Sequence, residues 1–442
     1  MPTLATATEE APARPATWLS RVRAGFTPPP LPSTSRRAFR FHMAFILLDA
    51  VFAGIMGNAP LMAVKSMGAT DVQLQVPLAM ASIGLFGAVF SGAAMATRRK
   101  KPFVLVPGFA GAISAMLMAW MTSAGWFLAI AGVISICDFG MRPAVPSILR
   151  IVYPDHCRSH IAGTLRQYAS IVFLGATLGS ASLLAAGAGQ IRHVIQFELM
   201  FAGFASVASY FCFQQLPDHG DGSEEEAAPV KVPVDGPRWP LLTPLLDRPF
   251  RRYLTIFFIF GFSNLFHSGI LPAFFARDMG LGYVQATLLL HIIPNLTAFL
   301  FGGQLSSWFD RTSIWRSYAF VTLMWGLDPV ILAVAPHVWP AVIAARILRG
   351  PATVGSMVIC FFTGVHSFAR PGGDTSRYMA ALFLVNGFAR LLAPLAAAFL
   401  LAYLSRRQIL FYGGMGCLLG SALFQWTDLH PPAVALPRKS NA

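Results

Sequence analysis

The chain contains about twelve apolar stretches, each of about twenty residues, the length that spans a bilayer as a helix. The second six stretches repeat features of the first six: Met67-Gly68 recurs as Met279-Gly280, 212 positions later. The same spacing relates further pairs: Arg40-Phe41 and Arg252-Tyr253, Pro60 and Pro272, Val72-Gln73 and Val284-Gln285, Arg98-Arg99 and Asp310-Arg311. Several matches at one spacing indicate duplication of a six-helix unit. Because each unit has an even number of spans, both copies enter the membrane from the same side and have the same orientation. A solute path between the two halves is therefore expected.

Composition indicates the same class of protein. Hydrophobic residues make up 55% of the 442 residues and charged residues 12%, with a mean hydropathy of +0.59, which leaves too little charge for a soluble surface. Within a bilayer each span must satisfy its own backbone hydrogen bonds, so the spans are expected to be helices. The predicted fold is an all-α polytopic membrane protein with about twelve transmembrane helices in two pseudo-symmetric six-helix bundles.

The expected domain organisation follows from where the apolar stretches begin and end. Residues 1–40 are rich in Pro, Ala and Thr and contain no signal-peptide core, and the stretch after residue 214 carries Glu224-Glu225-Glu226 and several prolines. We expect a disordered cytoplasmic tail (1–40), an N-terminal bundle (41–214), a cytoplasmic linker (215–249), a C-terminal bundle (250–426) and a cytoplasmic C-terminal tail (427–442).

The distribution of basic residues predicts the orientation. Arginines gather in the N-terminal tail, and Arg98-Arg99 continue into Lys100-Lys101 after the second span, whereas alternate connections are nearly free of charge. The positive-inside rule then puts both termini in the cytoplasm, and the high Ala, Arg and Pro usage fits a bacterial inner membrane. Arg406-Arg407 is an exception on the predicted outer side. The net charge of +14 is explained by inner loops, so no nucleic-acid partner is expected.

Over residues 40–426 the chain resembles the major facilitator superfamily, in which a short basic turn of the form Gly-x-x-x-Asp-Arg-x-Gly-Arg-Arg joins the second and third spans of each half. The first copy keeps Gly92 and the basic cluster but lacks the aspartate, and the second keeps Gly303 and Asp310-Arg311. The resemblance implies alternating access by a secondary transporter, with the gating loops at Arg98, Arg99, Asp310 and Arg311.

The resemblance also implies that the first, fourth, seventh and tenth spans line a central cavity. Asp49 lies in the first of these and Asp138 and Arg142 in the fourth, four residues apart and able to pair. This pair is either an intrahelical salt bridge that keeps both charges buried or a pair that breaks during transport, so that Asp138 takes up a proton. Asp49 is a comparable proton-coupling candidate, or else a helix-entry residue reaching toward Arg142 or Arg40.

Candidate substrate contacts are the buried polar residues of the remaining central spans. Arg390 lies too deep to reach either surface, so an anion is expected beside it, either the substrate or a protein carboxylate. Arg346 is expected to extend toward the outer surface, and Asp328 lies in the normally peripheral ninth span. The predicted substrate-binding set is Arg142, Arg349, Arg390, Asn264, His267 and His291. A hydrogen-bonded structural role is the alternative for both histidines.

Together these residues predict a secondary active transporter for a small anionic or zwitterionic solute, coupled to protons and working as a monomer in the lipid bilayer. The alternative is a non-transporting assembly factor or sensor of the same fold. No span boundary gathers a nucleophile, base or metal cluster, so an enzyme is not expected. His156, Cys157 and His160 lack a fourth ligand, so no metal or cofactor is expected either.

Overall fold

The computed structural model describes residues 33–95, 99–142, 144–153, 155–217, 243–309, 311–358, 365, 367–368 and 375–430. Two of the expected gating residues, Arg98 and Asp310, lie outside these ranges, as do the side chains of His156, Cys157 and His160. The terminal segments 1–32 and 431–442 and the linker segment 218–242 also lie outside them.

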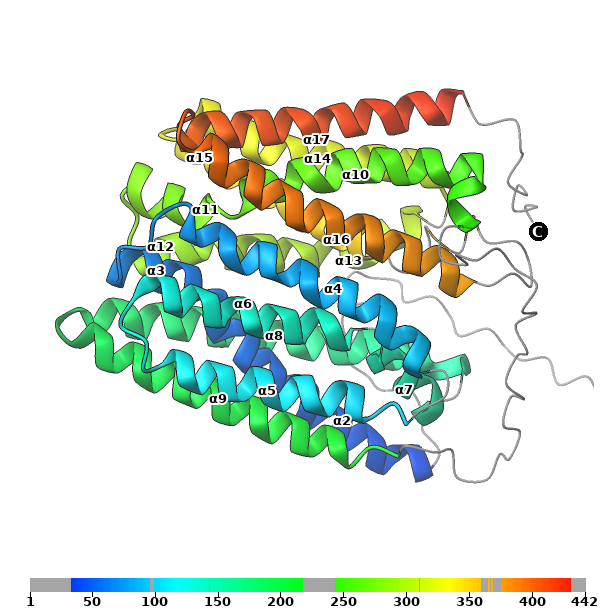
Figure 1. The fold of residues 1–442 in the computed structure, drawn as a ribbon, viewed down its shortest axis with the longest axis horizontal. Coiled ribbons are helices and arrows are strands. Elements are labelled where there is room, and N and C mark those ends of the chain that lie inside the picture. The colour runs from blue at the N-terminus through cyan, green and yellow to red at the C-terminus, as the bar shows by residue number, and fades with distance from the viewer. Residues whose placement is uncertain are drawn as a thin grey trace, which may run out of the picture.

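Long helices run side by side along the longest axis of the molecule (Figure 1). The first half consists of α2 (Ser33–Gly57), α3 (Ala59–Ser66), α4 (Val76–Met95), α5 (Pro102–Met118), α6 (Ala124–Met141), α7 (Ala144–Val152), α8 (Asp155–Ala186) and α9 (Ile191–Gln214). The second half consists of α10 (Arg248–Ser268), α11 (Leu271–Ala273), α12 (Tyr283–Thr287), α13 (Ile293–Phe309), α14 (Ile314–Val334), α15 (Trp339–Val358), α16 (Thr375–Leu400) and α17 (Arg406–Leu429). Among the described residues, helices and turns account for the whole fold.

Ten segments of the described chain are long and apolar enough to cross a bilayer. Two further expected spans, the third and the tenth, correspond to the shorter apolar helix α5 and to α15, which carries Arg346 and Arg349. The protein is thus a multi-pass membrane protein, and the predicted helical fold is confirmed.

Some helices extend beyond the expected spans. Apolar residues mark only the part of a helix that lies in the hydrocarbon core of the membrane, whereas the helix itself can continue past it. α2 begins at Ser33, inside the expected tail, and α17 continues to Leu429. Two spans are broken near prolines, since proline lacks an N–H and disfavours helix in the residue before it. The first breaks at Asn58, ahead of Pro60, and the fourth after Arg142, ahead of Pro143.

The duplication predicted from the sequence is visible in the backbone. Gly68 (φ 67°) and Gly280 (φ 65°), 212 positions apart, are the positive-φ residues of the described chain. Each follows a helix end with the same long hydrogen bond, from Ala69 N to Ala63 O (2.9 Å) and from Leu281 N to Phe275 O (3.0 Å), which closes the turn around the left-handed glycine. In each copy a glutamine then caps the next span: Gln73 accepts from Thr70 N, and Gln285 accepts from Gly282 N.

The two halves meet where α4 packs against α16, where α8 packs against α12 and α13, and where α3 approaches α11 (Figure 1). The contact of α4 with α16 is close because Gly387 has no side chain: a Cβ there would lie 2.6 Å from the ring of Phe86. Phe388 contacts the same ring, with centroids 5.3 Å apart. This close approach brings Arg390, one turn further along α16, to the first half.

Candidate functional site

The expected pair of the fourth span forms near the end of α6. Arg142 Nη2 donates to Asp138 Oδ2 at 2.7 Å, and the two side chains remain 38% and 46% exposed. α6 ends at this point because Pro143 follows, so the pair lies where the span changes direction. Both side chains therefore remain partly accessible.

Arg390 contacts the first half through an aromatic ring. Its guanidinium carbon lies 4.3 Å from the ring centroid of Phe139, and the guanidinium carbon of Arg142 lies 3.9 Å from the same centroid. Such cation–π contacts stabilise a desolvated guanidinium without neutralising it. The Nε of Arg390 is buried and has no hydrogen-bond partner in the described chain. A donor of Arg390 is thus left for an anion.

Asp49 completes this central charged cluster, which we define as Asp49, Asp138, Phe139, Arg142 and Arg390. Asp49 and Asp138 interact electrostatically, as do Arg390 and the Asp138–Arg142 pair. Unlike Asp138, Asp49 makes no hydrogen bond or ion pair with any described residue. The cluster holds two carboxyls and two guanidiniums, so it is balanced in formal charge.

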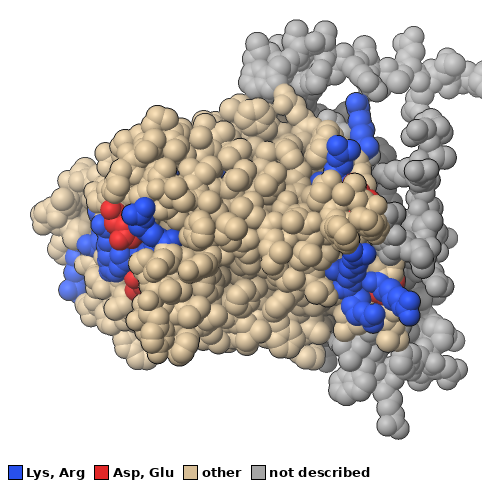
Figure 2. All heavy atoms as spheres, turned by 90° about the horizontal axis from the view of Figure 1, so that it is seen from above, with Lys and Arg blue, Asp and Glu red and all other residues tan. Residues whose placement is uncertain are grey.

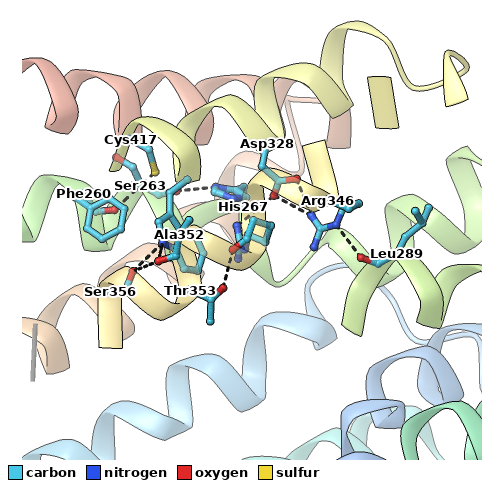
Figure 3. A network of polar contacts seen from close by, with 12 residues as sticks. Phe260, Ser263, His267, Leu289, Asp328, Arg346, Ala352, Thr353, Ser356 and Cys417 are labelled. Carbon is cyan, nitrogen blue, oxygen red and sulfur yellow. Dashed lines mark hydrogen bonds and ion pairs between the residues drawn. The ribbon is translucent and has the colours of Figure 1, made fainter. Parts of the chain in front are cut away.

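Arg349, the third arginine of the predicted substrate-binding set, belongs to a separate buried network with Asp328 and Arg346. Figure 3 shows Asp328 and Arg346 pointing toward one another. Arg346 Nη1 donates to both carboxylate oxygens of Asp328 at 2.8 Å, and Arg349 Nη1 donates to Asp328 Oδ2 at 3.3 Å. Arg346 and Asp328 are 2% and 0% exposed, so the expectation that Arg346 reaches the outer surface is wrong. Arg346 can stay buried because Asp328 supplies the anion that a fully desolvated guanidinium requires beside it.

Aromatic and backbone groups complete the surroundings of these arginines. The guanidinium carbon of Arg349 lies 3.5 Å from the ring centroid of Trp325. Arg346 Nε donates to Leu289 O at 2.8 Å, within the π-helical turn Leu288–Ile292 between α12 and α13. Since a π-turn disturbs the regular α-helical hydrogen bonds, Arg346 supplies a donor to this carbonyl. The network joins the π-helical turn before α13 to α14 and α15.

The remaining predicted binding residues have different surroundings. His267 is buried, and its Nδ1 lies 2.9 Å from Ser263 O of the preceding turn, which is the structural alternative considered for it. His291 Nε2 lies 2.9 Å from Gly57 O and so connects the two halves. Asn264 Oδ1 is buried without a hydrogen-bond partner in the described chain.

Two expected structural roles can be compared with the contacts. The gating-loop residues Arg99 and Arg311 are exposed. Gly175 and Gly179 of α8 are spaced one turn apart, as small residues at a close helix contact often are, but a Cβ at either would meet no atom within 4 Å. The close contact of α8 is instead made by Ala176, opposite Gly54 of α2. The glycine that allows α2 and α8 to pack closely is therefore Gly54 of α2.

Ion pairs close one end of the interface between the halves, the end opposite the linker. Asp71 of the first half accepts from Arg406 Nε at 2.7 Å and from Arg277 Nη1 at 3.2 Å. Arg406 also donates to Asp278 at 2.9 Å, within the second half. These contacts explain the arginine at position 406 that departed from the expected charge distribution: Arg406 is paired. Lysines, arginines and acidic residues gather at the two ends of the molecule, and the middle of the visible face lacks them (Figure 2).

A buried hydrogen-bonded chain lies behind these ion pairs. Thr287 Oγ1 donates to Asn58 Oδ1 at 2.8 Å across the interface, and Asn58 Nδ2 donates to Ser180 Oγ at 3.1 Å. Ser180 Oγ in turn donates to Glu198 Oε2 at 2.6 Å. All four side chains are buried. The chain connects the helix break at Asn58 to α8, α9 and the second half.

No protein-family model matches the sequence, and no curated protein matches it. Solved structures match over most of the chain. A POT family transporter in complex with a thioalcohol-conjugated peptide shares 12% identity, with a TM-score of 0.67 over 89% of this chain and 96% of that one. The nucleoside transporter NupG shares 13% identity (TM-score 0.64, 90% and 99% covered). A bacterial homolog of the human lysosomal transporter Spinster, inward-facing and unoccupied, shares 14% identity (TM-score 0.63, 90% and 98% covered).

These three structures are of the major facilitator type, and the chain has the major facilitator superfamily fold. The resemblance given by the six-plus-six repeat and the basic turns is thereby confirmed at the level of fold.

Sequence reasoning missed the pairing of Asp328, Asp71 and Glu198. Asp328 and Glu198 carried an available signal, because each is a carboxyl inside an apolar span and requires a partner. Their partners lie 18 positions away along the chain, on the preceding helix for Glu198 (Ser180) and on the following helix for Asp328 (Arg346). Asp71 carried no such signal, because its partners come from the other half of the chain.

The buried network predicts a large stability difference between two aspartate substitutions. Asp328→Asn leaves two arginines without a carboxylate inside the second half and is expected to cost about 3–5 kcal/mol, the usual effect of breaking a buried pair. Asp138→Asn removes a half-exposed pair and is expected to cost no more than about 1 kcal/mol. Thermal unfolding of the two detergent-purified variants measures the difference. Equal melting temperatures would contradict the assigned role of Asp328.

Proposed function

We propose that this protein is a secondary transporter that moves a small anionic or zwitterionic solute across the membrane by alternating access. The observation that carries the proposal is the position of Arg390: a deep arginine of the second half with an unused donor, stacked on Phe139 of the first half. A group that binds there contacts both halves at once. Binding that depends on their relative position is what couples a solute to a change of access.

The charges of the central cluster support a carboxylate-bearing solute with a second polar end. Arg390 and Arg142 attract a carboxylate, whereas Asp49, which has no partner, attracts an ammonium group. A POT family transporter of the same fold has been solved in complex with 5-aminolevulinic acid, a molecule with both groups. Arg349 is satisfied by Asp328 and contributes little to binding, so the proposed contacts are Arg390, Arg142 and Asn264.

Ligand-induced stabilisation tests the proposed contact between the solute and Arg390. At a hundredfold excess over its dissociation constant, a ligand of the folded state stabilises it by about 2.7 kcal/mol, which a melting curve detects. Small anions, zwitterions and cations should be compared on the full-length protein in detergent. Carboxylates or amino acids are expected to stabilise it, and Arg390→Ala is expected to weaken that binding at least about tenfold, because a charge-assisted bond is lost.

The matched control is Arg311→Ala, which removes an exposed arginine outside the central cluster. It should bind the solute as the unaltered protein does. Stabilisation by cations alone would contradict the proposed substrate class. If no solute in the panel stabilises the protein, and partner proteins are captured instead, the non-transporting assembly factor or sensor becomes the better interpretation.

We further propose that Asp49 carries the coupling proton, with Asp138 as its neighbour. The Asp49 carboxyl makes no hydrogen bond or ion pair with a described residue, so it is available to bind and release a proton. Arg142 already holds Asp138 at 2.7 Å. Arrival of a substrate cation at Asp49 would displace that proton, so binding and protonation are linked.

Transport measurements separate coupling from binding. With the solute identified above, Asp49→Asn in proteoliposomes is expected to abolish accumulation driven by a proton gradient, because the amide cannot release a proton. Solute counterflow, which needs no net proton movement, should persist at saturating solute, although it will need a higher solute concentration because the charge that attracts the ammonium group is lost. Asp278→Asn, a carboxyl outside the cluster, serves as control. Full proton-driven accumulation by Asp49→Asn would rule out this role.

The position of the interhalf bonds supports alternating access with this state closed at the outer end. Between described residues, every hydrogen bond and ion pair that joins the halves lies at the end opposite the linker: Asn58–Thr287, Gly57–His291, Lys65–Leu281, Ser66–Tyr283, Asp71–Arg277, Ala69–Arg277 and Asp71–Arg406. Opening to that side must break them. The proposed orientation, with the termini in the cytoplasm of a bacterial inner membrane, makes this the outer side.

Asp71→Asn is predicted to open the outer closure more often. Two partly exposed ion pairs across the interface are lost, so labelling of a Thr287→Cys reporter by a membrane-impermeant maleimide should rise about fivefold. Peptide mass spectrometry at position 287 measures the rate independently of the native cysteines. Asp278→Asn in the same background removes a carboxylate that pairs with Arg406 within one half, and should leave the rate unchanged. Equal rates in the two variants would contradict the proposal.

A single chain contains the whole proposed path, because both halves contribute to the central cluster. We therefore propose that a monomer suffices for transport. The same proteoliposomes test this: with one fluorescently counted chain per vesicle, solute uptake should be retained.

A further inference from the structure

A groove lies between the start of α10 and the end of α17, with a volume of about 380 Å³. Its α10 side is one stripe of that helix, at helical spacing: Arg248, Arg251, Arg252, Thr255, Ile256 and Ile259. Leu423 and Thr427 of α17 line the other side. The stripe changes from three arginines at the helix end to aliphatic side chains further into the span. The groove is therefore cationic at the membrane surface and apolar toward the membrane interior.

The three arginines make no ion pair with a described residue. The neighbouring carboxylates have other partners: Asp247 accepts from Tyr378 at 3.4 Å, and Asp428 accepts from Ser313. Arg248 and Arg251 are exposed and Arg252 is partly buried. Three guanidiniums thus gather over about one helical turn without an ion-paired carboxylate among the described residues, which makes a positive site.

A second groove begins at the same arginine and lies on the other side of α10, against α16. It shares Arg251 and Thr255 with the first and is otherwise apolar, lined by Leu245, Leu254, Phe258, Val385, Phe388 and Leu392. Phe388 and Leu392 are exposed, as expected of side chains that face lipid. Two apolar grooves therefore diverge from one cationic head site, at the end of the candidate span Arg248–Asp278.

We propose that this surface binds an anionic phospholipid. The phosphate lies on Arg248, Arg251 and Arg252, and the two acyl chains follow the grooves on either side of α10. One cationic site that leads into two apolar grooves matches the shape of a phospholipid, which has one headgroup and two acyl chains. The charge argument is complementarity: a zwitterionic phosphatidylcholine headgroup would leave the net positive charge of three arginines uncompensated, whereas phosphatidylglycerol supplies a net negative charge.

Native mass spectrometry of the detergent-purified full-length protein, titrated with dioleoyl phosphatidylglycerol or dioleoyl phosphatidylcholine, tests the proposal. Phosphatidylglycerol is expected to bind and phosphatidylcholine to bind much more weakly. Each arginine near an anionic headgroup contributes about fivefold in affinity, so R248Q/R251Q/R252Q should weaken phosphatidylglycerol binding about a hundredfold. The control R99Q/R311Q/R316Q removes three exposed arginines outside the grooves and should bind as the unaltered protein does.

Two further measurements distinguish the lipid from other sources of the same chemistry. Thr255→Trp fills both grooves while keeping the arginines, and should weaken phosphatidylglycerol binding without lowering the melting temperature in detergent. Glycerophosphate, which has the headgroup without chains, should not compete at concentrations where the lipid saturates. Equal binding of the two lipids, equal losses in the two triple variants, or competition by glycerophosphate at lipid-like concentrations would each overturn the proposal.

Discussion

The cost of a charge inside a nonaqueous medium governs how the second half is built. Asp328 holds two arginines from α15, and those arginines in turn hold a carbonyl of the π-turn between α12 and α13 and the ring of Trp325 on α14. An ionised group removed from water without a partner costs several kcal/mol, so these three charges stabilise one another and fix three helices in one arrangement. The tenth span can then be less apolar than the others and still remain in the bundle.

The central cluster contrasts with this network in how completely its charges are satisfied. Around Asp328 the described donors and acceptors are matched within one half, which favours a rigid body. Around Arg390 and Asp49, donor and acceptor capacity remains unused, and the groups come from both halves. This arrangement suits a mechanism in which the solute pairs with the unused groups of Arg390 and Asp49. The two halves would then move as rigid units around the bound solute.

The sequence predicted the fold well because each span carries its own signal. Apolar length identifies a helix without knowledge of its neighbours, and the glycine and glutamine repeats that mark the first loop of each half act within a few residues. The cluster around Asp138 was predictable for the same reason, since Arg142 lies one helical turn away. Pairing between distant helices was not: Arg349 and Arg390 are alike as isolated arginines in apolar spans, and only the position of Asp328 separates a structural arginine from an available one.

The paired Arg406 has a consequence for how the chain enters the membrane. Its partner Asp71 precedes it by 335 positions, so the two meet only after the halves assemble. In the proposed orientation, the last two spans must therefore carry Arg406 and Arg407 across the bilayer against the membrane potential, at about 2.3 kcal/mol per charge per 100 mV. Biogenesis of the final hairpin is thus opposed by the field. Once Arg406 has crossed, Asp278 of the second half and Asp71 of the first half each pair with it, so the assembled fold keeps this arginine at the outer end.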